Sequence, residues 1–124
     1  MEQNTILTTG IYDLIKDHLR RKKVTIEQET LLTERLKKCK QVLRRDLPTN
    51  VVTVNTKVKV KDMQTNQEIE MQLVGPKKAK STKNRFSVVS EIGLATIGFK
   101  VGDITQWPTE NTVKQYEIVA INAV

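Results

Sequence analysis

The stretch VVTVNTKVKVK, from Val51 to Lys61, alternates apolar side chains with polar or charged ones. Because successive side chains of a β-strand point to opposite faces, this period of two predicts a strand with one buried face and one wet face. The buried set is Val52, Val54, Thr56, Val58 and Val60, and the wet set is Thr53, Asn55, Lys57, Lys59 and Lys61. This half of the chain is therefore predicted to form a β-sheet.

The segment that follows repeats the alternation after a turn. Turn-forming residues fill Asp62–Gln67, and the alternation resumes with Ile69, Met71 and Leu73 against Glu68, Glu70 and Gln72. Two alternating runs joined in this way predict a β-hairpin, with lysines of one strand facing glutamates of the other.

The remaining C-terminal residues predict a small α+β domain. Gly75-Pro76 ends the second strand, and a polar loop follows over residues 77–84. A short strand around residues 86–89 precedes a brief helix, which Ser90 caps and Gly98 ends. Strands over residues 101–107 and 113–120 close the domain, so we expect an antiparallel sheet curled against one short helix.

Upstream of Leu47-Pro48 the apolar period is helical. Thr8 or Thr9 can cap a first helix, and Thr25 with Gln28 has the capping-box spacing that starts a second helix at about Ile26. The first helix carries Ile11, Leu14, Ile15 and Leu19, and the second carries the heptad seam Leu32, Leu36, Cys39 and Leu43. Facing stripes predict a short antiparallel helical hairpin, a coiled coil whose second helix is about 30 Å long. We expect residues 1–47 to form a projecting arm and residues 48–124 a separate domain.

Composition favours a binding protein over an enzyme. The chain has 124 residues with 21 Lys and Arg against 14 Asp and Glu, and it contains one cysteine and one histidine. The net charge of +7 favours an acidic partner, while so few nucleophilic and metal-ligating side chains lead us to expect no catalytic site, metal or other cofactor. No apolar run approaches the roughly 20 residues of a membrane span, and the start lacks signal-peptide features, so we expect a cytoplasmic protein without a membrane partner.

Two basic clusters are candidates for contact with nucleic acid or an acidic protein. One is the turn Arg20, Arg21, Lys22 and Lys23, and the other consists of Lys77, Lys78, Lys80, Lys83 and Arg85. Cations at the end of a helix also complement its dipole and stay solvated without any partner, so both readings of the turn are open. Neither cluster has the interleaved aromatic residues that stack on single-stranded bases.

Four runs of sequence resemble a known family. They are DLPTNVVTVNTKV from Asp46, IEMQLVGP from Ile69, FSVVSEIGLATIGFKVGD from Phe86, and YEIVAI from Tyr116. Together they resemble the C-terminal domain shared by the Gre transcript-cleavage factors and the regulator of nucleoside diphosphate kinase, Rnk. The short arm makes the layout most similar to Rnk.

The resemblance implies an FKBP-like C-terminal domain that docks on RNA polymerase at the mouth of the secondary channel. By the same resemblance, docking falls on two neighbouring stretches of the domain. The predicted docking residues are Val74, Gly75, Pro76, Ser90, Ile92, Gly93, Leu94 and Ile97.

The tip of the arm separates this chain from the Gre factors, which place acidic residues there to help hold a catalytic magnesium ion. Here the turn from Arg20 to Lys23 presents only cationic donors, while a hard cation needs oxygen ligands. Asp17 and Glu27 flank the turn among positive charges. We therefore expect a non-catalytic regulator that binds polymerase and modulates elongation or competes with Gre-type factors.

Two other functions are compatible with parts of the sequence. A basic protein could bind nucleic acid without polymerase, although the charge is divided between the two halves of the chain. A peptidyl-prolyl isomerase would share the FKBP-like fold, but it needs an aromatic-lined pocket. The aromatic residues are Tyr12, Phe86, Phe99, Trp107 and Tyr116. We expect no small-molecule substrate.

Overall fold

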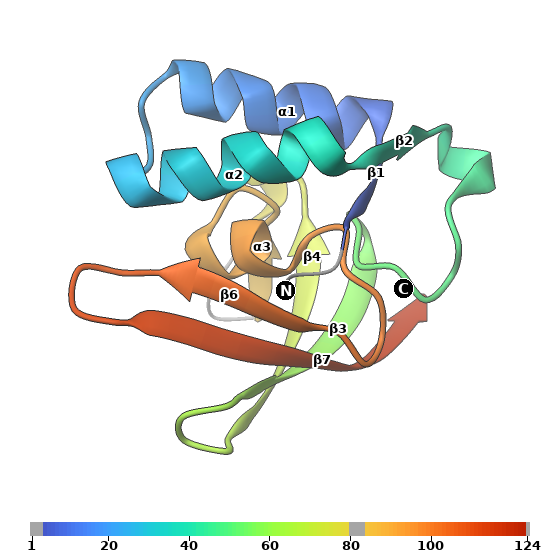
Figure 1. Ribbon diagram of the computed structural model, residues 1–124. Helices are drawn as coiled ribbons and strands as arrows, with labels where there is room; N and C mark the ends of the chain where they lie inside the picture. The colour runs from blue at the N-terminus through green and yellow to red at the C-terminus, as the bar shows by residue number, and fades with distance from the viewer. Residues whose placement is uncertain (1–3, 80–83, 124) are drawn as a thin grey trace.

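The computed structural model describes residues 4–79 and 84–123 and shows an α+β protein (Figure 1). Its main sheet has five strands in the order β5-β4-β3-β7-β6. The strands are β3 (Thr56–Asp62), β4 (Glu68–Val74), β5 (Arg85–Ser87), β6 (Ile104–Pro108) and β7 (Val113–Ala123). All neighbours are antiparallel except β4 and β5, which are parallel, so the prediction of a wholly antiparallel sheet is wrong at this edge.

The predicted hairpin of β3 and β4 is confirmed in register. Lys59 lies opposite Glu70 and Lys61 opposite Glu68, while Val58 and Val60 are fully buried on the other face. The strand begins later than the alternation predicts, because the chain turns at Asn55, whose φ is +63°. Val51 and Val52, which precede this turn, are nevertheless buried, and the amide of Val52 donates to the carbonyl of Phe99 at 2.9 Å.

The short helix α3 (Glu91–Thr96) is also confirmed. The Ser90 hydroxyl accepts a hydrogen bond from the amide of Gly93 at 3.2 Å, which is the expected N-terminal cap. The helix gives way to Gly98, whose φ of +87° suits glycine, and a Cβ at this position would lie 2.7 Å from Cδ2 of Leu7. Gly98 therefore permits the N-terminal segment to pass close to the end of α3.

The helices α1 (Thr9–Arg20) and α2 (Ile26–Lys38) form the predicted antiparallel pair (Figure 1). The Thr8 hydroxyl caps α1 by accepting from the amide of Ile11 at 3.4 Å. Thr25 and Gln28 form the predicted capping box, with hydrogen bonds of 3.1 and 3.2 Å. Both helix starts follow from local sequence. No helix among the described residues is long and apolar enough to cross a membrane.

The predicted end of the second helix is wrong. The helix ends at Lys38, Cys39 is already extended, and residues Lys40–Val42 form strand β2. This strand pairs in parallel with β1 (Ile6–Thr8), and the amide of Lys40 donates to the carbonyl of Thr5 at 3.0 Å. The pairing satisfies backbone groups that a longer helix would have used internally. Leu43, predicted in the heptad seam, is 53 % exposed.

The helical hairpin does not project from the domain. It packs on the same side of the sheet as α3 (Figure 1), and its buried residues join the core of the sheet domain in one cluster. The hairpin contributes Ile11, Ile15, Leu19, Leu32 and Leu36 to this cluster. The expectation of a free arm is therefore wrong, because the apolar stripes of the helices are wide enough to cover each other and the domain. The boundary between residues 47 and 48 stays a prediction about folding.

Candidate functional site

Gln28 holds the start of α2 against the sheet domain. Its side chain is 3 % exposed, and Nε2 donates to Oε1 of Glu91 at 3.1 Å and to the carbonyl of Pro108 at 2.8 Å. The same side chain accepts from the amide of Thr25 in the capping box. One glutamine therefore serves both the start of the helix and the contact between hairpin and domain.

Arg35 makes the second polar contact, two turns further along α2. Its Nη1 donates to the carbonyl of Leu94 at 3.2 Å, and Nη2 donates to the carbonyl of Gln106 at 2.7 Å. The guanidinium carbon lies 4.8 Å from the centre of the Phe99 ring. Because Arg35 is 8 % exposed, its charge is placed in the interface, where these carbonyls and the aromatic face compensate its lost hydration.

Sequence reasoning missed both contact residues, although the signal was present. Gln28, Leu32, Arg35 and Leu36 recur at spacings of one helical turn and are all buried. A polar residue repeated on an apolar stripe needs a hydrogen-bonding partner, which points to an interface rather than to solvent.

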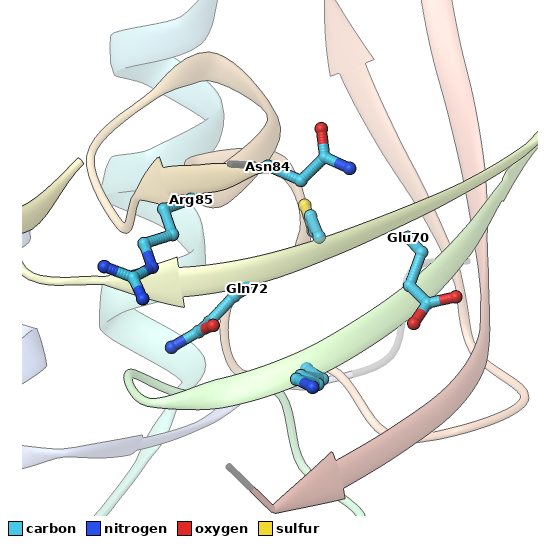
Figure 2. Close-up of a pocket in the computed structure, with 6 residues that line it drawn as sticks. Glu70, Gln72, Asn84 and Arg85 are labelled. Atoms are coloured by element: carbon cyan, nitrogen blue, oxygen red, sulfur yellow. The ribbon is translucent and has the colours of Figure 1, made fainter. Parts of the chain in front are cut away.

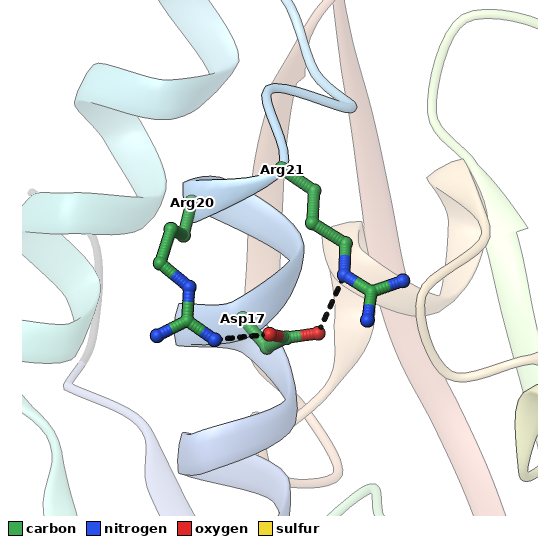
Figure 3. A network of polar contacts seen from close by, with 3 residues as sticks. All are labelled: Asp17, Arg20 and Arg21. Atoms are coloured by element: carbon green, nitrogen blue, oxygen red, sulfur yellow. Dashed lines mark hydrogen bonds and ion pairs between the residues drawn. The ribbon is translucent and has the colours of Figure 1, made fainter.

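The basic turn at the end of the hairpin is paired with nearby carboxylates. Asp17 accepts a hydrogen bond from Arg20 and forms an ion pair with Nε of Arg21 at 3.0 Å, so that one carboxylate lies between two guanidinium groups (Figure 3). Lys22, with φ of +56°, reaches Oε1 of Glu29 at 2.9 Å. All four residues of the turn are exposed. Among the described residues there is no group of three or more His, Cys, Asp or Glu that could hold a metal ion.

A cavity of about 350 Å³ lies between this turn and α3. His18, Lys22 and Lys23 line it from the hairpin, and Glu91 and Trp107 line it from the domain. Burial lowers the pKa of His18, and the nearby positive charge of Lys23 lowers it further. The imidazole is therefore neutral at neutral pH. The structure thus brings the basic turn and the helix that follows Ser90 together, which the idea of a projecting arm did not anticipate.

The predicted docking residues divide into core and surface. Val74, Leu94 and Ile97 are at most 3 % exposed, and Gly93 is buried where a Cβ would lie 2.8 Å from the carbonyl oxygen of Val88. These four positions belong to the core. Pro76 is exposed, while Gly75, Ser90 and Ile92 are partly exposed.

Gly75, Pro76 and Ser90 lie at one end of the β4–β5 pair. Val74 is paired with Ser87, and the amide of Ser90 donates to the carbonyl of Ser87 at 3.0 Å. This places Gly75 and Pro76 next to the start of α3. We name the surface formed by Gly75, Pro76, Ser90 and Ile92 the α3-edge surface.

Other residues singled out from the sequence have structural roles or lie elsewhere. Cys39 is half-buried and its thiol donates to the carbonyl of Leu36 at 3.2 Å, while burial raises its pKa.

In the second basic cluster, Lys77 and Lys78 are exposed in the short 3-10 helix η2 (Pro76–Lys78), and Arg85 begins β5. Lys80 and Lys83 lie outside the described residues.

Comparison with known proteins matches the sequence to one family. The protein-family model described as "Transcription elongation factor, GreA/GreB, C-term" matches residues 47–123, which is more than half of the chain.

Curated relatives give the same result. The transcription elongation factor GreA of Acetivibrio thermocellus is 36 % identical over 90 residues, which cover 73 % of this chain and 57 % of the relative. GreA of Clostridium acetobutylicum is 40 % identical over 86 residues, covering 69 % of this chain and 54 % of the relative. The chain therefore spans little more than half the length of the curated relatives it matches.

Solved structures share the fold. A GreA/GreB transcription elongation factor from Nitrosomonas europaea superimposes with a TM-score of 0.68 at 21 % identity, over 98 % of this chain and 99 % of that one. Gfh1 of Thermus aquaticus gives a TM-score of 0.53 at 22 % identity, over 93 % of this chain and 72 % of that one. At these identities the likeness is one of fold.

Proposed function

This chain belongs to the GreA/GreB family of transcription elongation factors through its C-terminal domain, and from that premise we propose that it is a regulator that binds RNA polymerase without promoting transcript cleavage. The proposal includes an FKBP-like C-terminal domain, docking near the secondary channel, and action in the cytoplasm. The matched relatives are longer than this chain, so its activity is argued from its own residues.

The basic turn carries the proposal. A catalytic Mg²⁺ is held by oxygen ligands, and the tip of this hairpin presents the side chains of Arg20, Arg21, Lys22 and Lys23. The carboxylate of Asp17 is already ion-paired with both Arg20 and Arg21 (Figure 3). A carboxylate neutralised by two guanidinium groups is a poor ligand for a cation, so the turn opposes metal-assisted cleavage.

The α3-edge surface is the part of the domain that we assign to polymerase docking. Ile92 is a partly exposed apolar side chain, Pro76 is exposed and Ser90 is half-buried. An apolar side chain with a polar rim is the composition that protein interfaces use. The hairpin borders this surface, because Gln28 donates to Glu91 and Arg35 donates to the carbonyl of Leu94, both on α3.

A binding experiment with matched variants tests the docking assignment. Ile92→Asp places a charge on the α3-edge surface, and Leu43→Asp makes the same change at a residue that is 53 % exposed and remote from α3 in sequence. With immobilised core polymerase, we expect Ile92→Asp to weaken binding by about tenfold or more and Leu43→Asp to leave it unchanged, since an interface depends on a few central side chains. Equal binding by both variants, with both folded by circular dichroism, would contradict the assignment.

A Gre factor added to the same immobilised polymerase tests competition. If both proteins use one docking site, the Gre factor displaces this chain in proportion to its concentration. Simultaneous binding of the two proteins would rule out a shared site.

A further inference from the structure

A row of three side chains crosses three strands on the outer face of the sheet. Lys57 of β3 is paired with Gln72 of β4, and Gln72 is paired with Arg85 of β5. Directly paired residues project to the same face of a sheet. Their neighbours along the strands, Val58 and Leu73, are fully buried on the opposite face, so the row faces away from the core.

This row differs in charge from the rest of the β3–β4 face. Lys59 lies opposite Glu70 and Lys61 lies opposite Glu68, so those rows each pair a cation with an anion. Lys57 lies opposite an amide, and the next strand adds a second cation, Arg85. Neither the Lys57 nor the Arg85 side chain forms an ion pair or hydrogen bond with another described residue.

The row lies in a hollow of about 350 Å³ (Figure 2). Besides the three side chains of the row, the hollow is lined by Glu70, Met71 and Asn84. Asn84 is held beside Gln72, because the backbone carbonyl of Asn84 accepts a hydrogen bond from the backbone amide of Gln72 at 2.9 Å. Arg85 and Glu70 stand at opposite ends of the hollow in Figure 2, so the carboxylate limits the positive region to one side.

We propose that this hollow binds a phosphate of a nucleic-acid backbone. Lys57 supplies a point charge, Arg85 supplies the forked donors that match phosphate oxygens, and Gln72 adds an amide between them. The negative charge of Glu70 limits the contact to a short stretch of the nucleic-acid backbone. No aromatic side chain lines the hollow within the described residues, so the contact reads phosphate and not base sequence.

The composition of the hollow favours nucleic acid over an acidic protein segment. Stable protein interfaces are built around exposed apolar or aromatic anchors, and Met71, the apolar residue of the lining, is 1 % exposed. Nucleic-acid interfaces are more polar and positively charged. The volume also exceeds what one carboxylate needs and leaves room for a sugar next to the phosphate. The inference does not depend on polymerase binding.

The test uses the full chain without polymerase, so its failure is distinguishable from failure of polymerase docking. The probe is a labelled single-stranded DNA of mixed sequence, about 20 nucleotides long, titrated by fluorescence anisotropy between about 50 and 200 mM salt. The variant Lys57→Gln/Arg85→Gln removes both cations of the row. The matched control Lys59→Gln/Lys61→Gln removes two charges from the same face, where each lysine faces a glutamate.

We expect the row variant to bind about tenfold more weakly at the lowest salt, and the magnitude of its salt slope to fall by about 0.7, the value for one lost phosphate contact on a single strand. The control should stay within about twofold of the parent chain. Equal weakening by both variants would show that net charge alone attracts DNA and would overturn the site. Absence of DNA binding at the lowest salt would also overturn the site. So would a chain that binds a polyglutamate peptide through the row but does not bind DNA.

Discussion

The sheet and the helical hairpin each bury one apolar face, but the partners of those faces lie at different distances along the chain. Strand β3 pairs with β4, the next strand in sequence, and the register from Lys57 to Lys61 follows the local alternation. The hairpin is held by Gln28 and Arg35, whose acceptors lie 59 to 80 residues away. Periodicity therefore identifies a buried face without identifying what covers it.

Removing the hairpin should have the largest effect on stability. A fragment of residues 48–124 loses the hairpin side chains that share one core cluster with Leu94 and Trp107. We expect urea denaturation to show that the fragment has lost a large part of the roughly 5–15 kcal/mol that stabilises a domain of this size. A fragment as stable as the full chain would show that the hairpin only rests on the domain.

Leu94 offers a sharper test of the shared core. It is 1 % exposed, and we expect Leu94→Ala to lower the free energy of unfolding by about 2–5 kcal/mol, because the cavity it leaves lies under the hairpin. Ile92→Ala, on the same helix but partly exposed, should cost less than about 1.5 kcal/mol. Similar losses from both variants in chemical denaturation would contradict the division between core and α3-edge surface.

Gln28 tests the polar contact between the two regions. Gln28→Ala removes both hydrogen bonds to the domain and the capping-box bond that its side chain accepts from the amide of Thr25, and should cost about 2–3 kcal/mol. Thr25→Ala removes only the cap and should cost about 1 kcal/mol. The difference between the two losses measures the contact with the domain, and equal losses would mean that this contact contributes nothing.

The smallest effect concerns pH. Because burial and Lys23 lower the pKa of His18 in the folded state, the unfolded chain binds its proton first as the pH falls. Stability should therefore be fully present above the unfolded pKa of about 6.5 and decline as the pH falls below it. His18→Gln should flatten the pH dependence of the unfolding midpoint between about pH 7 and 5. An unchanged dependence in the variant would assign the effect to another group.

Local signals were sufficient for the helix starts and the β3–β4 hairpin. Thr8, Thr25 and Ser90 are followed within three residues by the amides they cap, so the sequence contains both partners. The end of α2 could not be predicted in the same way. The apolar spacing continues through Cys39 and Leu43, and the strand that ends the helix by pairing, β1, lies more than 30 residues upstream.

The candidate site was predictable only in part. The four residues of the basic turn are contiguous in sequence, so the positive charge of the turn could be predicted without the structure. The α3-edge surface was mixed with core residues, because a helix of six residues gives Ile92 and Leu94 similar apolar character and only the hairpin decides which is covered. The row of Lys57 and Arg85 needed the parallel pairing of β5, which neither periodicity nor turn residues indicate.

Under the proposed function, this chain binds RNA polymerase, and its basic turn prevents it from promoting transcript cleavage. The most direct measurement is the rate of transcript cleavage by RNA polymerase stalled on a backtracked transcript, with this chain alone and together with a Gre factor. We predict no acceleration by this chain, and slower cleavage by the Gre factor as the concentration of this chain rises, since the proposed function has both proteins compete for one docking site. Acceleration that is lost in Asp17→Asn would contradict the claim, since it would mean that the carboxylate between Arg20 and Arg21 serves the metal.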